Sequence, residues 1–223
     1  MAETRPKKIL DVLRKTYTIP KWIMASEQPF ATLILTIISQ NTADKNTSRA
    51  FENLSRKFGI TPEVLANANR REIEECLRVA GLYRNKARAI KQVSKTILRR
   101  YKGNMKPILS LPVEEARRLL MQFPGVGPKT ADVVLLFCAK RMTIPVDTHV
   151  DRVSKRLGLV PATGNYETVR NALQSIFDPQ EFRQVHVLLI LHGRKCCKAR
   201  NPLCRECPIS MFCASRRLQD RND

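Results

Sequence analysis

The chain has 223 residues, enough to bury a sizeable hydrophobic core in one domain or in two small ones. Forty lysines and arginines stand against twenty aspartates and glutamates, and the resulting net charge of +20 favours a polyanion such as nucleic acid as the partner. The sequence has no apolar run long enough to span a bilayer and no secretory signal at its N-terminus, so we expect a protein of the cytoplasm or nucleoid that does not act on a membrane.

Apolar residues recur at the helical spacing of three and four residues through most of the chain. The clearest examples are Leu33 to Ile38, Ala50 to Phe58 and Val169 to Ile176. No segment shows the alternation of a strand, and short breaks containing Gly or Pro separate the periodic segments. The sequence therefore predicts an all-α fold.

A strongly basic helix is expected after Gly81-Leu82-Tyr83. From Arg84 to Lys106 there are nine basic residues and no acidic one. A solvated helix face would also be basic, but the absence of compensating acids over this length favours contact with phosphates.

Further along, Leu109 to Gln122 is predicted to be a helix with Ser110 as its N-cap and Pro124 as its end. A second helix is expected to begin at Pro128, which suits the first helical turn. The two helices would form a helix-hairpin-helix arrangement.

The hairpin itself is predicted to bind an anion. Gly125 and Gly127 flank Val126, so the backbone can turn tightly and approach another molecule without a side chain in the way. The helix that follows would direct its first N–H groups outward, where a phosphate can lie.

Lys129 falls in the first turn of this second helix, where the helix dipole disfavours the protonated amine, and a neutral amine is a nucleophile. Taken by itself, such a lysine could simply pair with a phosphate. Asp147 directly precedes another expected helix, and its simplest role is that of an N-cap. The two residues together favour chemistry on DNA.

Four cysteines near the C-terminus follow the pattern C-x6-C-x2-C-x5-C, which is compact enough for four thiolates to bind one metal centre. They are Cys197, Cys204, Cys207 and Cys213. The spacing leaves both structural zinc and an iron–sulfur cluster open. Cys76 and Cys138 lie in apolar helical patterns and are expected in the core.

These motifs together resemble the endonuclease III family of helix-hairpin-helix DNA glycosylases. The resemblance rests on PGVGPKTAD in the hairpin, VDTH around Asp147, LHGR before the cysteines and the cysteine pattern, and it covers about residues 20–213. It implies two helical lobes with a DNA-binding cleft between them. One would be a six-helix barrel-like domain with the helix-hairpin-helix, residues 23–136, and the other an iron–sulfur cluster domain, residues 1–22 and 137–223.

The resemblance also implies an activity, that of a base-excision repair enzyme. Such an enzyme removes oxidised pyrimidines from duplex DNA as an N-glycosylase and cleaves abasic sites as a lyase. Lys129 would attack C1′ of the flipped nucleotide and form a Schiff base, after which β-elimination breaks the strand. Asp147 would stabilise positive charge on the sugar and help to move protons.

Further site residues are implied in the same way. Gln40 would fill the gap left by the flipped nucleotide, and Leu82 would act as a wedge. The remaining expected DNA contacts are Gly125, Val126, Gly127, Lys198 and Arg200. The family often has a basic residue where this chain has Asn201, so which side chain of the 198–203 loop touches DNA stays open.

A [4Fe–4S] cluster bound by Cys197, Cys204, Cys207 and Cys213 is the implied cofactor, with Cys196 as a spare thiol. The implied partner is double-stranded DNA containing damaged pyrimidines or abasic sites, and a monomer is expected. The 8-oxoguanine glycosylases carry a similar lysine but commonly lack the cysteines. A DNA-binding module without catalytic activity is a different alternative, which the pairing of Lys129 with Asp147 argues against.

Overall fold

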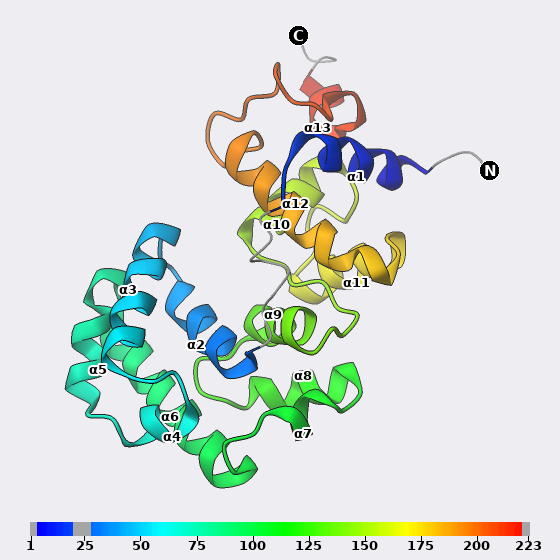
Figure 1. The fold of residues 1–223 in the computed structure, drawn as a ribbon. Coiled ribbons are helices and arrows are strands. Elements are labelled where there is room, and N and C mark those ends of the chain that lie inside the picture. Colours follow the sequence, from blue (N-terminus) through cyan, green and yellow to red (C-terminus); the bar gives the residue numbers. More distant parts are fainter. Residues whose placement is uncertain (1–3, 20–27, 220–223) are drawn as a thin grey trace. The chain divides into compact units, whose positions relative to one another are not determined.

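The computed structural model describes residues 4–19 and 28–219, and within these ranges the chain forms helices and no strand (Figure 1). This confirms the predicted all-α fold. The chain divides into two compact units, a terminal unit of residues 1–25 and 142–223 and a central unit of residues 26–141. Of the boundaries expected from the sequence, the one at residue 23 lies outside the described residues, and the one at residue 136 falls inside a helix.

The helices of the central unit are α2 (Pro29–Ser39), α3 (Asp44–Lys57), α4 (Pro62–Asn67), α5 (Arg70–Leu77), α6 (Tyr83–Tyr101), α7 (Lys106–Leu109), α8 (Val113–Met121) and α9 (Pro128–Cys138), with a 3-10 turn η2 (Arg78–Ala80) before α6. Among its described residues, six helices have eight residues or more, while α4 and α7 are shorter.

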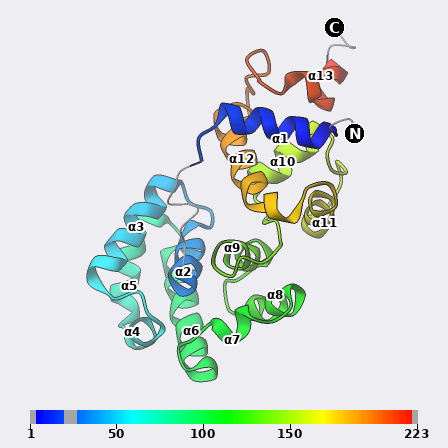
Figure 2. The same ribbon diagram turned by 45° about the vertical axis from the view of Figure 1, so that its right-hand side comes forward.

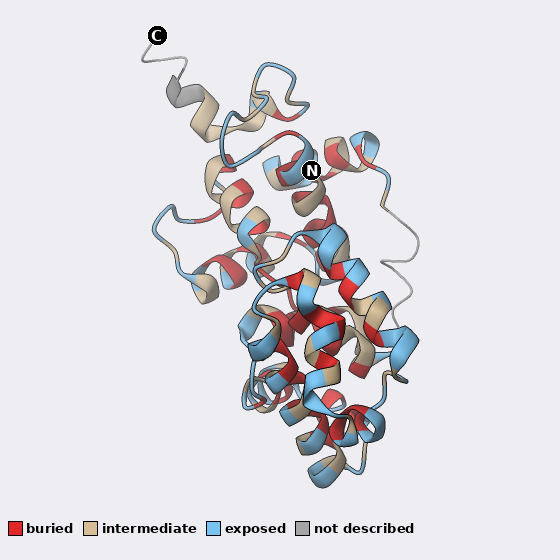
Figure 3. Cartoon of the chain, turned by 90° about the vertical axis from the view of Figure 1, so that its left-hand side faces the viewer, coloured by how far each residue is buried: buried red, intermediate tan, exposed pale blue. Residues whose placement is uncertain are grey.

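The core of the central unit is built around the apolar helix α2, which contacts α3, α6 and α9 (Figure 2). Leu33, Ile34 and Ile38 of α2 are completely buried. Burying a side chain of this size contributes about 1.5–3 kcal/mol. The surrounding helices turn their buried faces towards this core and their exposed faces outward (Figure 3). Cys76 is buried in this core, and Cys138 is half-buried.

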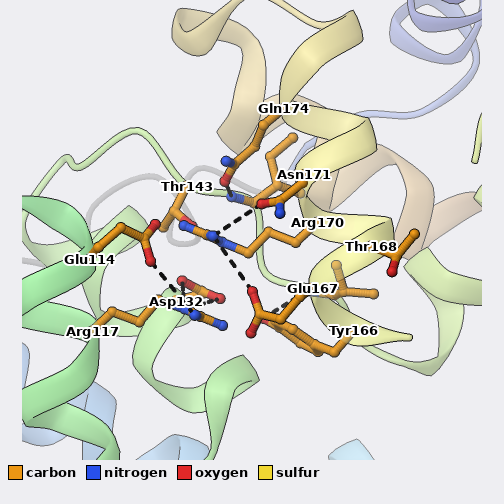
Figure 4. Close-up of polar contacts among 12 residues, drawn as sticks. Glu114, Arg117, Asp132, Thr143, Tyr166, Glu167, Thr168, Arg170, Asn171 and Gln174 are labelled. Atoms are coloured by element: carbon orange, nitrogen blue, oxygen red, sulfur yellow. Dashed lines mark hydrogen bonds and ion pairs between the residues drawn. The ribbon is translucent and has the colours of Figure 1, made fainter. Parts of the chain in front are cut away.

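A buried ion pair joins α8 to α9. The Nε of Arg117 lies 3.1 Å from Oδ1 of Asp132 and 3.2 Å from Oδ2, and the Asp132 side chain is wholly inaccessible to solvent (Figure 4). Removing one partner of such a pair costs about 3–5 kcal/mol, because the other charge stays buried and unpaired. The pair thus fixes the two helices that flank the hairpin.

The predicted start of the first hairpin helix is wrong. The helix α8 begins at Val113, and Ser110 instead ends the short helix α7, with its hydroxyl donating to the Lys106 carbonyl at 2.9 Å. The cause lies in Pro112, because a residue before proline, here Leu111, is disfavoured in the helical conformation. The predicted start of the second helix at Pro128 is confirmed.

The terminal unit contains α1 (Arg5–Thr16), α10 (Thr148–Leu157), α11 (Tyr166–Ile176), α12 (Phe182–Lys195) and α13 (Ala214–Gln219), with 3-10 turns η3 (Pro179–Glu181) and η4 (Ser210–Phe212). The helix α12 packs against α1 and α10, and α10 also contacts α11 and α13. A side chain at Gly193 would meet the Cβ of His149 at 2.9 Å, so glycine permits the close approach of α12 to α10. None of the described helices is both long and apolar enough to cross a bilayer.

Candidate active site and cysteine-lined cavity

The two hairpin glycines have different roles in the structure. Gly125 has φ +78°, a conformation that favours glycine, and a Cβ there would lie 2.8 Å from the Cβ of Ala89. Gly127 has φ −93° and ψ 179°, which any residue adopts, and no atom beyond its two chain neighbours lies within 4 Å of where its Cβ would be. Of the two hairpin glycines, the fold therefore requires Gly125. At Gly127 the absence of a side chain leaves space for another molecule.

Val126, between them, belongs to the hydrophobic core. Its side chain is buried, and its N–H donates to the Phe123 carbonyl at 3.0 Å. Any contribution of Val126 to phosphate binding would therefore come from its shaping of the turn, since its carbonyl oxygen is an acceptor like the phosphate oxygens.

Lys129 is the second residue of α9 and is half-buried. Gly127, at the N-cap position, has no side chain to accept hydrogen bonds from the first turn. The N-terminus of α9 thus combines N–H groups, the positive end of the helix dipole and a lysine, which together favour an anion.

Gln40, at the end of α2, is directly connected to this hairpin. Its Nε2 donates to the Gly125 carbonyl at 2.8 Å and lies 3.3 Å from the hydroxyl oxygen of Thr130, in the first turn of α9. The structure therefore brings two of the predicted DNA-contacting elements together within the central unit.

Leu82 directly precedes α6 and combines two unusual properties. Its backbone is left-handed, with φ 47° and ψ 26°, and its apolar side chain is 58% exposed. For a residue other than glycine this conformation costs about 1–2 kcal/mol. On the helix that follows, Arg84, Arg88 and Lys95 are exposed, whereas Lys91 is half-buried and donates to the Ala68 carbonyl.

Asp147 caps α10 as predicted. Its Oδ1 accepts hydrogen bonds from the N–H of His149 at 2.9 Å and of Val150 at 2.8 Å. The carboxylate is half-buried, so Oδ2 can take part in other interactions. Burial lowers the pKa of the neighbouring His149.

The segment that leads into Asp147 has no regular structure, yet side chains of α11 and α12 bind every one of its residues from 143 to 146. On α11, Arg170 donates to the hydroxyl oxygen of Thr143 at 2.9 Å. Gln174 and Tyr166 accept from the backbone N–H groups of Ile144 and Val146 at 3.1 and 3.3 Å. These three side chains are spaced four residues apart and therefore lie on one face of α11 (Figure 4).

The fourth contact to this segment comes from α12. The Nδ1 of His186 lies 2.8 Å from the carbonyl oxygen of Pro145, and because a carbonyl can only accept, this nitrogen carries the proton. The position of Asp147 is thus fixed by long-range side-chain contacts that its own sequence surroundings do not reveal.

Two arginines of α10 bind the loop that contains Lys198 and Arg200. Arg152 donates to the carbonyls of Gly193 and Cys197 at 2.9 and 3.0 Å. Arg156 donates to those of Lys198 and Ala199 at 2.7 and 3.1 Å. The side chains of Lys198 and Arg200 are exposed, so the loop backbone is held while its basic groups stay accessible.

A cavity of about 250 Å³ lies beside this loop, and all four predicted cysteine ligands line it. Cys196, His192, Arg156 and Arg216 also contribute to its wall. His192, Cys196 and Cys207 bring together three potential metal-binding atoms that all lie within 4.8 Å of one another. The sequence had singled out only Cys207 of these three as a ligand.

His192 connects this cavity to the N-terminal helix region. Its Nδ1 lies 3.0 Å from the hydroxyl of Tyr17, and its Nε2 lies 3.7 Å from the sulfur of Cys207. Burial lowers the pKa of His192 to about 4, so the ring is neutral near pH 7. This residue belongs to the motif LHGR, which carries part of the family resemblance, but only the structure shows that it lies beside Cys207.

Comparisons with known proteins agree on one family. Residues 34–179 match the family described as the HhH-GPD superfamily of base excision DNA repair proteins. An endonuclease III of Sulfolobus acidocaldarius is 38% identical over 185 residues, which cover 82% of this chain and 81% of that protein. An endonuclease III of Thermotoga maritima is 34% identical over 87% of both chains.

The fold leads to the same proteins. The solved structure of a trapped covalent intermediate between endonuclease III and DNA superposes with a TM-score of 0.84. It is 32% identical in sequence, and the match covers 99% of this chain and all of that one.

Proposed function

The chain belongs to the HhH-GPD superfamily of base excision DNA repair proteins, and from this we propose that it is an endonuclease III, a DNA glycosylase with abasic-site lyase activity. We propose oxidised pyrimidines in duplex DNA, and abasic sites, as its substrates. One observation supports the lyase assignment above others: a lysine lies in the first turn of α9, two residues after a glycine whose backbone leaves open space.

In the proposed reaction the neutral amine of Lys129 forms a bond to C1′ of a flipped nucleotide. The bond from C1′ to the base breaks, and the base leaves with a proton. Opening of the sugar ring gives an iminium, whose adjacent C2′ loses a proton so that the C3′–O bond breaks by β-elimination. Water then releases Lys129. At a site that has already lost its base, the amine condenses directly with the aldehyde.

Asp147 is proposed as the carboxylate that assists these steps. One of its oxygens is committed to capping α10, which orients the group, and the other can stabilise positive charge on the sugar or accept a proton. The contacts from α11 and α12 to residues 143–146 support this role, because electrostatic catalysis depends on a carboxylate that is held in place.

The proposed contacts to the DNA duplex come from several elements. Gln40 would exchange its hydrogen bonds to the hairpin for bonds to the orphaned base, while the exposed Leu82 would insert as a wedge. The backbone N–H groups of Gly125 and Gly127 would approach the phosphates, with Val126 shaping the turn between them, and Lys198 and Arg200 would bind other phosphates. The extrusion of the nucleotide itself costs a few kcal/mol, which these contacts must offset.

We propose that Cys197, Cys204, Cys207 and Cys213 hold a [4Fe–4S] cluster. Their lining of a single cavity fits such a group, and Arg156 and Arg216 on the wall would offset the charge of four thiolates. When bound, the cluster would crosslink the loop that carries Lys198 and Arg200. The neutral ring of His192 would remain beside the sulfur of Cys207.

Borohydride trapping tests the lyase proposal. The protein is mixed with a duplex bearing one abasic site and reduced, which converts an iminium into a stable amine. We expect a covalent adduct with the natural chain, none with Lys129→Gln, and an undiminished adduct with the control Lys57→Gln, whose lysine pairs with Glu72 on the surface. Absence of any adduct would point instead to a glycosylase without lyase activity or to a binding module.

A further inference from the structure

A buried lysine lies between the two loops that carry Gln40 and Leu82. We define the plug loop as residues 40–43 and the wedge loop as residues 80–82. Lys86, in the first turn of α6, is only 5% exposed, and its Nζ donates to the hydroxyl oxygen of Thr42 at 2.5 Å and to the carbonyl oxygen of Ala80 at 2.8 Å. One ammonium group therefore binds an oxygen from each loop.

Thr42 completes this connection. Its hydroxyl oxygen, which accepts from Lys86, lies 2.5 Å from the carbonyl oxygen of Ala80 and 3.1 Å from that of Gln40. Its single proton can be donated to one of these oxygens, and the shorter distance favours Ala80. Lys86, Thr42 and Ala80 thus form a closed triangle of hydrogen bonds between the two loops.

Both loops have unfavourable backbone conformations. Asn41 in the plug loop has φ +52° and Leu82 in the wedge loop has φ +47°, whereas Gly81, at φ +62°, adopts a conformation that glycine tolerates. For residues other than glycine such conformations cost about 1–3 kcal/mol and persist where the surroundings impose them. Lys86 binds the wedge loop at two points. Its Nζ donates to the Ala80 carbonyl, and its backbone N–H donates to the Leu82 carbonyl at 3.1 Å.

The stability of the fold does not account for a lysine at this position. Burial lowers the pKa of Lys86, and no acidic side chain contributes to raising it. Burying an ammonium is unfavourable, and a methionine would fill the same space without that cost. What a methionine lacks is the ability to bind two oxygens at once.

We propose that Lys86 is a positioning residue that locks the plug loop to the wedge loop, so that Gln40 and Leu82 enter the duplex together as one rigid unit. This inference rests on the proposed function, since it assumes that both side chains insert into DNA. Without the lock, each loop would relax from its unfavourable conformation independently, and neither insertion would support the other.

Fluorescence of 2-aminopurine provides a test that does not depend on catalysis. The duplex contains a tetrahydrofuran abasic analogue, which lacks the C1′ aldehyde and cannot form an iminium, and the probe base lies either opposite the analogue or next to it. The first position reports on Gln40 and the second on Leu82, because the probe brightens when it is unstacked. With saturating wild-type protein we expect both signals to rise.

Lys86→Met and Thr42→Val are expected to reduce both signals together. Loss of a hydrogen bond to a charged group corresponds to about a tenfold loss in the population of the inserted state. Thr42→Ser keeps the hydroxyl and is expected to restore both signals. Thr36→Val is the control, because it makes the same change at a buried threonine whose hydroxyl binds the Thr32 carbonyl within α2.

The inference is overturned if either variant lowers one signal and spares the other, or if Thr42→Ser behaves like Thr42→Val. Equal losses in Thr36→Val would indicate general destabilisation and would overturn it as well. If wild-type protein forms the borohydride adduct but raises neither signal, the inference fails while the proposed function stands. If wild-type protein raises both fluorescence signals but forms no borohydride adduct, the lyase proposal is contradicted while the inference about Lys86 stands.

Discussion

At the scale of single residues, the two hairpin glycines have different roles. Gly125 is required by the fold, whereas Gly127 is expected to matter for DNA binding. Gly125→Ala is expected to lower the free energy of unfolding by about 1–2 kcal/mol, because the left-handed backbone and the nearby Ala89 both oppose a side chain. Gly127→Ala has no such conflict, and we expect it to change the free energy of unfolding by less than about 1 kcal/mol, because the lower entropy of the unfolded chain is offset by the poorer fit of alanine at the N-cap of α9.

The same substitution at Gly127 is expected to weaken binding to an abasic-site duplex, since its methyl group would occupy the space in front of α9. Thermal unfolding and titration of a labelled duplex measure the two effects on the same protein. Undiminished affinity in Gly127→Ala would show that DNA does not approach this backbone closely.

Asp147 can be tested without disturbing its capping role. Asn caps helices about as well as Asp, so Asp147→Asn should fold and bind DNA normally while turnover on an abasic site falls by about a hundredfold or more. Asp178→Asn is the matched control, because Asp178 caps η3 in the same way, through the N–H of Gln180. Equal turnover in the two variants would exclude a catalytic role for Asp147.

At the scale of elements, α11 supports the segment before Asp147. In Tyr166→Phe the N–H of Val146 loses its acceptor, so we expect the free energy of unfolding to fall by about 1–3 kcal/mol. We also expect kcat to fall while the Kd for substrate DNA is unchanged, because the carboxylate would be held less firmly. Single-turnover kinetics and binding titrations at a temperature where the variant stays folded distinguish these effects.

Tyr101→Phe serves as the control for this element. It removes the same hydroxyl group from α6 in the central unit, where the ring of Tyr101 packs edge-on against Phe123 at a centroid distance of 6.3 Å. A drop in kcat of the same size in both variants would show that the effect does not act through α11 and the segment it holds.

At the scale of the whole molecule, we expect a cluster bound by the four cysteines to stabilise the C-terminal part of the terminal unit. The segment from residue 196 to 213 has little regular structure, and a bound cluster would crosslink it. We expect Cys204→Ser to lose most of its iron and to become sensitive to protease within this segment, while Cys196→Ser keeps its iron. Iron content per chain and mapping of the cleavage sites measure both effects.

The outcome also distinguishes the two adjacent cysteines. Cys196 belongs with His192 and Cys207 to a group of ligand atoms within 4.8 Å of one another, whereas the family resemblance assigns the cluster ligand to Cys197. Loss of iron in Cys196→Ser, with retention in Cys197→Ser, would assign the cluster to Cys196 instead.

Local signals were sufficient for much of the fold. The periodicity of the apolar residues predicted the helices, and Pro128 and Asp147 marked helix starts that the structure confirms. These features depend on neighbours within about one helical turn, which the sequence displays directly. Ser110 shows the limit, because its capping chemistry predicts a helix start there, whereas the stronger effect of Pro112 on Leu111 delays the helix to Val113.

The sequence by itself determined the composition of the site: an excess of positive charge, a lysine at a helix start, a capping aspartate and a compact set of cysteines. Tertiary structure alone decided what holds these groups, namely Lys86 between two loops and α11 beside the segment before Asp147. The physical reason is range. Lys86 binds Thr42 across 44 positions of the chain and Gln174 binds Ile144 across 30, and contacts at such separations form only when the whole core packs.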